Sequence, residues 1–94
     1  MRREGLSRGL QGARRVRVQV KLYTYFAKYC PENSERGLFT LELAPPVSVG
    51  DLLQKLGIPS DYPKVVHVNR EFSREETLLE DGDFLAVFPP LPGG

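Results

Sequence analysis

The sequence predicts an α+β domain in which one helix covers one face of a mixed sheet of four to five strands. Three observations predict this fold class: the order of the strand and helix patterns, the presence of a single amphipathic helix pattern, and a final strand that is apolar on both faces. The chain has 94 residues, of which 40% are hydrophobic and 27% charged, which suits one globular domain. We expect that domain to span residues 16–88.

The first two strands are indicated by alternating apolar and polar residues. Over residues 16–22 the apolar positions are Val16, Val18, Val20 and Leu22. Residues 23–29 are too short for a helix to be predicted, and the polar segment 31–37, with proline and glycine at its ends, is typical of a loop. A second alternating pattern follows over residues 39–43. It ends at Pro45-Pro46, because proline cannot donate a hydrogen bond to a strand ladder.

The helix pattern follows and carries its own start and stop signals. Ser48 is the expected N-cap, and Asp51 three residues later completes a capping box. The apolar residues then recur at i, i+3, i+4 and i+7, which places them on one face of a helix: Val49, Leu52, Leu53 and Leu56. Gly57 fits the position just after a helix, where a positive φ is favoured.

The rest of the domain is predicted to be strands and turns. Residues 65–68 indicate a third strand, and Phe72 opens a short fourth one. We expect Leu78-Leu79 to fold back onto the core. Residues 81–83 (Asp-Gly-Asp) form a tight turn by composition. Residues 84–88 are apolar on both faces, so we place them at the sheet centre beside the first strand.

The scarcity of reactive side chains excludes several kinds of site. With one histidine (His67) and one cysteine (Cys30), the chain cannot build a Cys/His zinc site, a Cys-x-x-Cys redox pair or an internal disulfide. We expect Cys30 to be a small buried or half-buried residue, and His67 to face solvent or a satisfied surface site. No apolar run approaches the ~20 residues of a membrane span, so no membrane partner and a cytoplasmic location are expected.

The formal net charge of +1 is the sum of two segments of opposite charge. Residues 1–15 carry five arginines and one glutamate, a net +4, whereas residues 16–94 carry a net −3. The basic arm has no apolar period and is expected to be disordered. It also lacks the aromatic residues that stack on bases, so we expect a solvated extension and no nucleic-acid partner. The alternative is that its arginines contact phosphate groups. The G-x-S-x-G match at residues 5–9 lacks the flanking strand and helix of a nucleophile elbow.

The feature that points to function is the end of the sequence, Phe88-Pro-Pro-Leu-Pro-Gly-Gly94. Proline lacks an N–H and favours an extended conformation, so residues 89–94 form a flexible tail that does not extend the sheet. Six residues reach roughly 20 Å. The two glycines present a slim carboxylate that could enter a channel too narrow for a Cβ atom. The alternative is an ordinary frayed terminus.

Several segments, in this order, resemble the MoaD/ThiS family of ubiquitin-like sulfur carriers. They are the strand at 16–22, the helix segment 47–57, Val66-His-Val-Asn69, the turn Leu79-Glu-Asp-Gly-Asp83 and the run Val87-Phe-Pro-Pro-Leu-Pro-Gly-Gly94. The Phe88-Pro89-Pro90 element is closer to the MoaD branch, that of the molybdopterin synthase small subunit. The resemblance covers residues 16–94 and implies the β-grasp (ubiquitin-like) fold.

The resemblance implies a protein co-substrate rather than an enzyme. An E1-like enzyme (MoeB/ThiF-like) would use Mg-ATP to adenylate the carboxylate of Gly94, which follows Gly93. A persulfide donor would then leave a thiocarboxylate, and the sulfur would pass to an acceptor through a MoaE-like synthase subunit, in molybdenum or tungsten pterin cofactor biosynthesis. The chain itself would bind no cofactor or metal, and would be a monomer when free. Partner contact is expected at Phe88, Pro89, Pro90 and Leu91.

The same sequence is compatible with two other functions. A ubiquitin-like modifier would be joined through Gly94 to a lysine by an isopeptide bond. A non-covalent β-grasp interaction module would bind its partner without the tail.

Overall fold

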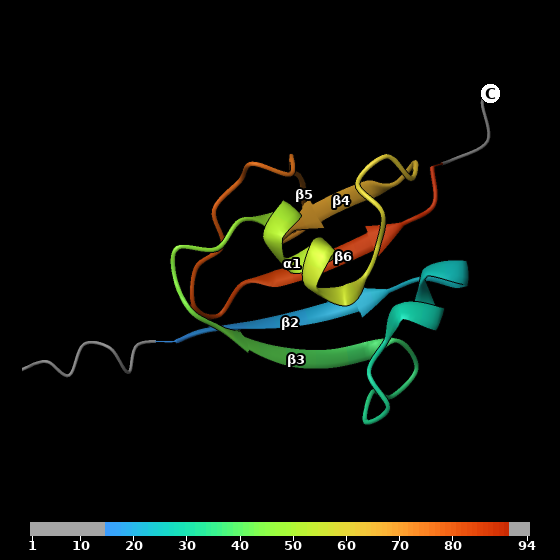
Figure 1. Ribbon diagram of the computed structural model, residues 1–94, viewed down its shortest axis with the longest axis horizontal. Coiled ribbons are helices and arrows are strands. Elements are labelled where there is room, and N and C mark those ends of the chain that lie inside the picture. The colour runs from blue at the N-terminus through green and yellow to red at the C-terminus, as the bar shows by residue number, and fades with distance from the viewer. Residues whose placement is uncertain (1–14, 91–94) are drawn as a thin grey trace, which may run out of the picture.

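A computed structural model describes residues 15–90, which form a five-stranded mixed sheet with one α-helix on one face (Figure 1). In chain order the elements are β2 (Val16–Leu22), the 3-10 helix η2 (Thr24–Tyr29), β3 (Leu38–Leu43), α1 (Val49–Leu56), β4 (Val65–Val68), β5 (Glu71–Phe72) and β6 (Phe84–Phe88). The predictions made for residues 1–14, including the G-x-S-x-G match, and for residues 91–94 lie outside the described residues.

The last strand, β6, lies in the sheet interior, as its apolar sequence predicts. The strand order is β3-β2-β6-β4-β5. β6 pairs in parallel with β2 and antiparallel with β4, while β3 and β5 form the two edges. The first and last strands are therefore neighbours, and the predicted α+β, β-grasp arrangement with one main helix is confirmed. No helix in the described part of the chain has the length and apolar character needed to cross a bilayer.

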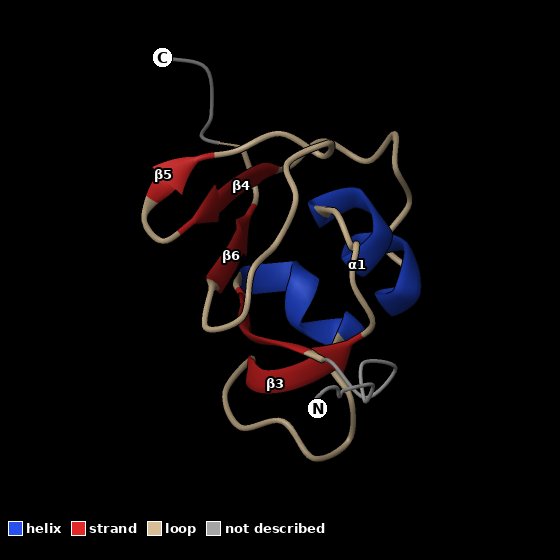
Figure 2. Ribbon diagram, turned by 90° about the vertical axis from the view of Figure 1, so that its left-hand side faces the viewer, coloured by secondary structure: helices blue, strands red, loops and turns tan. Residues whose placement is uncertain are grey.

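The hydrophobic core lies between α1 and the sheet (Figure 2). Strand residues that alternate along β2 and β6 are buried there, together with three residues of α1: Val16, Val18, Val20, Leu22, Leu85, Val87, Val49, Leu52 and Leu53. Leu79 joins this core, but Leu78 is 62% exposed, so the expectation that both leucines pack inward is wrong for Leu78. Neighbouring residues of an extended segment face opposite sides, and Leu78 lies in a bridge with Ser48.

The start and stop signals of α1 work as the sequence predicts. The Ser48 hydroxyl oxygen accepts a hydrogen bond from the Asp51 N–H (3.0 Å), and the Asp51 carboxylate accepts one from the Ser48 N–H (3.0 Å). Gly57 follows the helix with φ +88°, and its N–H donates to the Gln54 carbonyl. This left-handed conformation suits glycine because it has no Cβ.

Asn69 ties together two of the segments that carry the family resemblance. Its side-chain oxygen accepts from the Phe84 N–H (2.9 Å), and its side-chain N–H donates to Asp83 (2.9 Å). The other carboxylate oxygen of Asp83 accepts from the Glu80 N–H (2.8 Å). Asn69 and Arg70 both have positive φ, as a two-residue hairpin turn requires. The end of β4 is thereby held against the beginning of β6.

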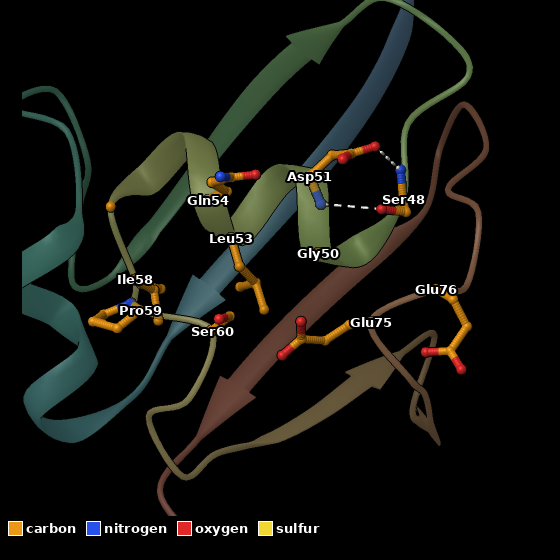
Figure 3. A pocket seen from close by; sticks show the side chains of 11 residues that line it. Ser48, Gly50, Asp51, Leu53, Gln54, Ile58, Pro59, Ser60, Glu75 and Glu76 are labelled. Atoms are coloured by element: carbon orange, nitrogen blue, oxygen red, sulfur yellow. Dashed lines mark hydrogen bonds between the residues drawn. The ribbon is translucent and has the colours of Figure 1, made fainter.

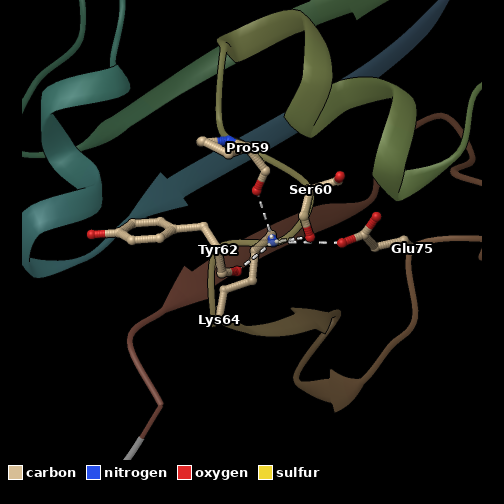
Figure 4. Close-up of polar contacts among 5 residues, drawn as sticks. All are labelled: Pro59, Ser60, Tyr62, Lys64 and Glu75. Atoms are coloured by element: carbon tan, nitrogen blue, oxygen red, sulfur yellow. Dashed lines mark hydrogen bonds and ion pairs between the residues drawn. The ribbon is translucent and has the colours of Figure 1, made fainter.

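Lys64 is a buried cation that fastens the connection between α1 and β4 (Figure 4). Its side chain is only 5% exposed. The ammonium donates to the carbonyls of Pro59 (3.2 Å), Ser60 (3.2 Å) and Tyr62 (2.7 Å), and lies 3.5 Å from the Glu75 carboxylate. One side chain therefore links three backbone oxygens to the segment that precedes β6.

Replacing this ammonium is expected to destabilise the fold. In Lys64→Met the length and apolar stem are kept, but three carbonyls each lose a hydrogen bond, so the free energy of unfolding should fall by about 2–3 kcal/mol. Lys55→Met, at an exposed lysine of α1, should change it by less than about 0.5 kcal/mol. Equilibrium urea unfolding gives the free energy of unfolding of both variants. Equal decreases in the two would contradict the role given to Lys64.

Candidate functional site

The chain leaves the sheet at the end of β6. Phe88 is the last residue of the strand and lies opposite Val65 of β4. Pro89 is half-buried and Pro90 is exposed, and neither can donate to a further ladder bond. Three of the predicted partner-contact residues, Phe88, Pro89 and Pro90, are therefore placed together at the root of the tail. Leu91, Gly93 and Gly94 lie outside the described residues, so their roles stay predictions.

Four aromatic rings form a chain of contacts that begins at this root. Tyr23 stacks on Phe88, with ring centroids 4.5 Å apart and planes at 15°. Phe88 contacts His67 at 5.1 Å, and His67 contacts Phe72 at 4.8 Å, both in edge-to-face geometry. These separations are typical of favourable aromatic pairs. We call Tyr23, Phe88, His67 and Phe72 the aromatic row.

Strand register explains why three of these rings lie on the same face. On β6, Leu85 and Val87 belong to the core, so Phe88 points to the opposite face. His67 lies beside Ala86 of β6 on one side and beside Phe72 of β5 on the other. The aromatic row therefore crosses the sheet on the face away from α1, from the root of the tail to the edge strand.

The aromatic row is exposed at both ends. Phe72 is 82% exposed and Tyr23 is 36% exposed, whereas Phe88 and His67 are half-buried between them. Phe72 stays this exposed although its ring contacts His67, because β5 is only two residues long and forms an edge of the sheet. Exposed, contiguous apolar surface of this kind typically marks a site of protein interaction.

His67 does not occupy the satisfied surface site that we expected. Its Nε2 atom is buried and has no hydrogen-bond partner within residues 15–90. Two phenylalanine rings, from β5 and β6, flank the imidazole in edge-to-face geometry.

Sequence reasoning predicted Phe88 as a contact residue but missed Phe72 and His67. The sequence predicts only that Phe72 begins a strand and that His67 faces solvent or a satisfied surface site. The signal that could have found them is the two-residue turn at Asn69-Arg70, which places Phe72 directly across from His67 in a hairpin.

The other half of this sheet face is polar. Arg17 of β2 pairs with Glu42 of β3 at 2.8 Å, and this hydrogen bond, followed by the negative charge of Glu42, raises the pKa of the Arg17 guanidinium. The Lys21 ammonium donates to the Arg36 carbonyl (2.8 Å) and lies 5.5 Å from the Tyr23 ring centroid. The aromatic row is thus bordered by charge along β2 and β3.

A cavity of about 640 Å³ lies elsewhere, between the start of α1, the turn after α1 and the segment with Glu75 and Glu76 (Figure 3). The first helix amides beside it already have acceptors: Val49 N–H donates to Thr77, and Gly50 N–H to Glu75. The cavity therefore offers carboxylates but no free helix amide for an anion. None of its lining residues belongs to the aromatic row.

The remaining candidate for chemistry is Cys30, which is half-buried against the core, as expected. Within residues 15–90, no three His, Cys, Asp or Glu side chains gather in an arrangement that could hold a metal ion.

The chain matches a family and several solved structures. The model of the ThiS family matches residues 23–94. A search of curated proteins found no match. Among solved structures, SAMP1 from Haloferax volcanii has a TM-score of 0.62 at 23% identity, covering 83% of this chain and 99% of that protein.

Two further structures are similar. A chain in the complex of subunits 1 and 2 of the molybdopterin-converting factor from Helicobacter pylori has a TM-score of 0.53 at 20% identity, covering 84% of this chain and 100% of that one. The thiamine biosynthesis protein ThiS from Geobacter metallireducens has a TM-score of 0.51 at 19% identity, covering 81% and 99%. At these identities the likenesses establish the fold.

Proposed function

The chain belongs to the ThiS family of small ubiquitin-fold sulfur carriers and modifiers, and we propose that it carries sulfur as a thiocarboxylate on Gly94. The observation that carries the proposal is the continuity between the aromatic row and the root of the tail. Phe88 is the last residue of β6 and a member of the row, so a partner that docks on the row meets the beginning of the tail. The slim Gly93-Gly94 end then suits entry into the partner's active site.

The chemistry requires only the terminal carboxylate of this chain. One oxygen of the Gly94 carboxylate attacks the α-phosphorus of Mg-ATP on an E1-like enzyme, an O–P bond forms, and pyrophosphate leaves. The terminal sulfur of a persulfide attacks the acyl carbon, and AMP leaves. A thiol then cleaves the S–S bond of the acyl disulfide; the thiol is oxidised to a disulfide, and the thiocarboxylate remains.

A second partner would take the sulfur. We propose a synthase subunit similar to MoaE, with the precursor of a molybdenum or tungsten pterin cofactor as acceptor. Two observations support this branch: the Phe88-Pro89-Pro90 element, and the similarity to a chain from a complex of two molybdopterin-converting factor subunits. In this role the chain is a co-substrate or synthase subunit, and the catalytic groups belong to its partners.

Intact mass spectrometry tests the proposed function. The chain is incubated with the E1-like enzyme of its own organism, Mg-ATP, a persulfide donor and a thiol. We expect the mass to rise by the replacement of one oxygen with sulfur, and to stay unchanged without ATP. No change with every component present, while the same enzyme activates another carrier, would refute the proposal.

Similarity to SAMP1, which is named a small archaeal modifier protein, favours one alternative function. As a modifier, the chain would end in an isopeptide bond from Gly94 to a lysine of another protein. The adenylate is shared by both functions, so the distinguishing measurement is the product. Covalent adducts of higher mass in cell extract, lost when Gly94 is removed, would support the modifier.

The aromatic row is expected to supply most of the docking energy. Phe72→Asp places a charge on the most exposed ring, and because exposed aromatics are frequent binding hot spots, the KM for this chain in ATP–pyrophosphate exchange should rise by roughly 30-fold. Leu78→Asp is the matched control, since Leu78 is also an exposed apolar residue but lies outside the aromatic row. Equal KM values for the two variants would show that the row is not the docking surface.

A further inference from the structure

The backbone is strained at one residue beside the root of the tail. Thr24 has φ +57°, in the left-handed region. A β-branched residue rarely adopts this conformation, because its Cβ substituents crowd the backbone. Strain of this kind persists where the surroundings hold it in place, and it often lies at functional sites. Thr24 stands between two tyrosines that make different contacts.

Tyr23 and Tyr25 pack on different parts of the domain. The Tyr23 ring stacks on Phe88, at the end of β6. The Tyr25 ring contacts Phe26 at 4.9 Å and Tyr62 at 5.9 Å instead. The tyrosines are similarly exposed, at 36% and 45%, and belong to the same short segment. The Tyr23 ring is the one that stacks on a residue of the strand from which the tail departs.

Phe88 lacks a backbone partner on one side, and Tyr23 occupies that side. On the β4 side, Phe88 pairs with Val65. On the β2 side the ladder ends one residue earlier, where Leu22 pairs with Val87. The Tyr23 N–H then donates to the Val87 carbonyl (3.0 Å), and the Tyr23 ring covers Phe88. We propose that Tyr23 is a positioning residue that fixes the direction in which the tail leaves β6.

Direction at the root matters because the reacting group is far away. Three prolines favour an extended conformation of this six-residue tail, which then reaches roughly 20 Å. In that conformation, a swing of about 15° at its root moves its tip by about 5 Å. In-line attack requires the carboxylate oxygen to approach the phosphorus to about 3–3.5 Å. Tyr23 therefore raises the fraction of docked molecules whose carboxylate reaches the nucleotide. This role rests on the proposed function and adds a residue that acts through Phe88.

Steady-state ATP–pyrophosphate exchange with the E1-like enzyme tests this role. Tyr23→Ala should lower kcat by roughly 3- to 10-fold, the factor expected for the loss of one stacked aromatic pair. Tyr23→Phe keeps the stacked ring and should restore the wild-type kcat. Tyr25→Ala is the matched control and should also leave kcat unchanged. If thermal melting shows that Tyr23→Ala is unfolded at the assay temperature, Tyr23→Leu replaces it, because leucine fills the space without stacking.

The outcomes separate this inference from the function on which it rests. An unchanged kcat in Tyr23→Ala would overturn the inference. This holds even if KM is raised, because a raised KM alone describes a simple contact with the partner. If the wild-type chain is not activated at all, the proposed function fails instead. An enzyme-free measurement then still decides the positioning role: the backbone N–H order parameter of Phe88, from ¹⁵N relaxation, should fall in Tyr23→Ala but not in Tyr25→Ala. An unchanged order parameter would overturn it.

Discussion

Removal of Gly94 is expected to abolish formation of the thiocarboxylate. The shortened chain still ends in a glycine carboxylate, but that group lies about 3.3 Å closer to the domain. A reacting carboxylate displaced by a whole residue cannot approach the α-phosphorus while the aromatic row stays docked, and misplacements of about 1 Å already reduce rates by about 100-fold. Intact mass spectrometry after incubation with the E1-like enzyme, Mg-ATP and the sulfur source should show no exchange of oxygen for sulfur.

Two matched chains make this result specific. A chain with one extra glycine after Gly94 should also fail, because its carboxylate lies one residue too far. Gly94→Ala keeps the length but adds a Cβ atom, so its failure would show that the channel accepts only glycine. Sulfur gained by the shortened chain at the wild-type rate would refute the assignment of Gly94 as the reacting residue.

Gly37→Ala is expected to have the largest effect on stability. Gly37 has φ +80°, and a Cβ atom placed there would clash with the Leu22 carbonyl oxygen. Gly37 comes directly before β3, and the Leu22 N–H donates to its carbonyl (2.9 Å), just beyond the last register pair of β2 and β3, Lys21 and Leu38. The strands must separate to admit the methyl group. With the left-handed conformation also disfavoured, the free energy of unfolding should fall by about 3–4 kcal/mol.

Gly57→Ala separates the clash from the conformational cost. Gly57 has a similar φ of +88°, but an added Cβ there meets no atom within 4 Å. The free energy of unfolding of Gly57→Ala should therefore fall by only about 1–2 kcal/mol, the cost of the left-handed conformation for alanine. Urea unfolding at equilibrium compares the two variants. Equal losses would contradict the clash at Gly37.

The sequence was sufficient to predict elements whose signals are local. The capping box at Ser48 and Asp51 and the glycine after the helix define α1, and both act through hydrogen bonds within a few residues. The period-2 pattern of residues 16–22 defines β2 and its buried face. The central place of β6 was also predictable, because a strand that is apolar on both faces must be covered on both sides.

Features that depend on contacts between distant segments were not predictable. The aromatic row joins rings from just after β2, from β6 and from the β4–β5 hairpin, so it exists only once the register of four strands is known. Lys64 looks like an ordinary surface lysine until the turn after α1 wraps around its ammonium.

Short helices such as η2 are also hard to predict, because they rest on few backbone bonds and carry no periodic signal. The roles of Gly93 and Gly94 stay predictions from the family resemblance.

The place of β6 in the sheet also bears on how the protein is made. Synthesis proceeds from the N-terminus, so β6, which pairs with both β2 and β4, is the last of the five strands to leave the ribosome. Until then β2 and β4 have no common neighbour, and the core lacks Leu85 and Val87. Folding must therefore await long-range pairing late in synthesis, which is intrinsically slow. A chain interrupted before residue 88 cannot complete its sheet and is exposed to proteases. Such a chain also lacks the root of the tail, so the strand that completes the core is the same strand that presents the tail.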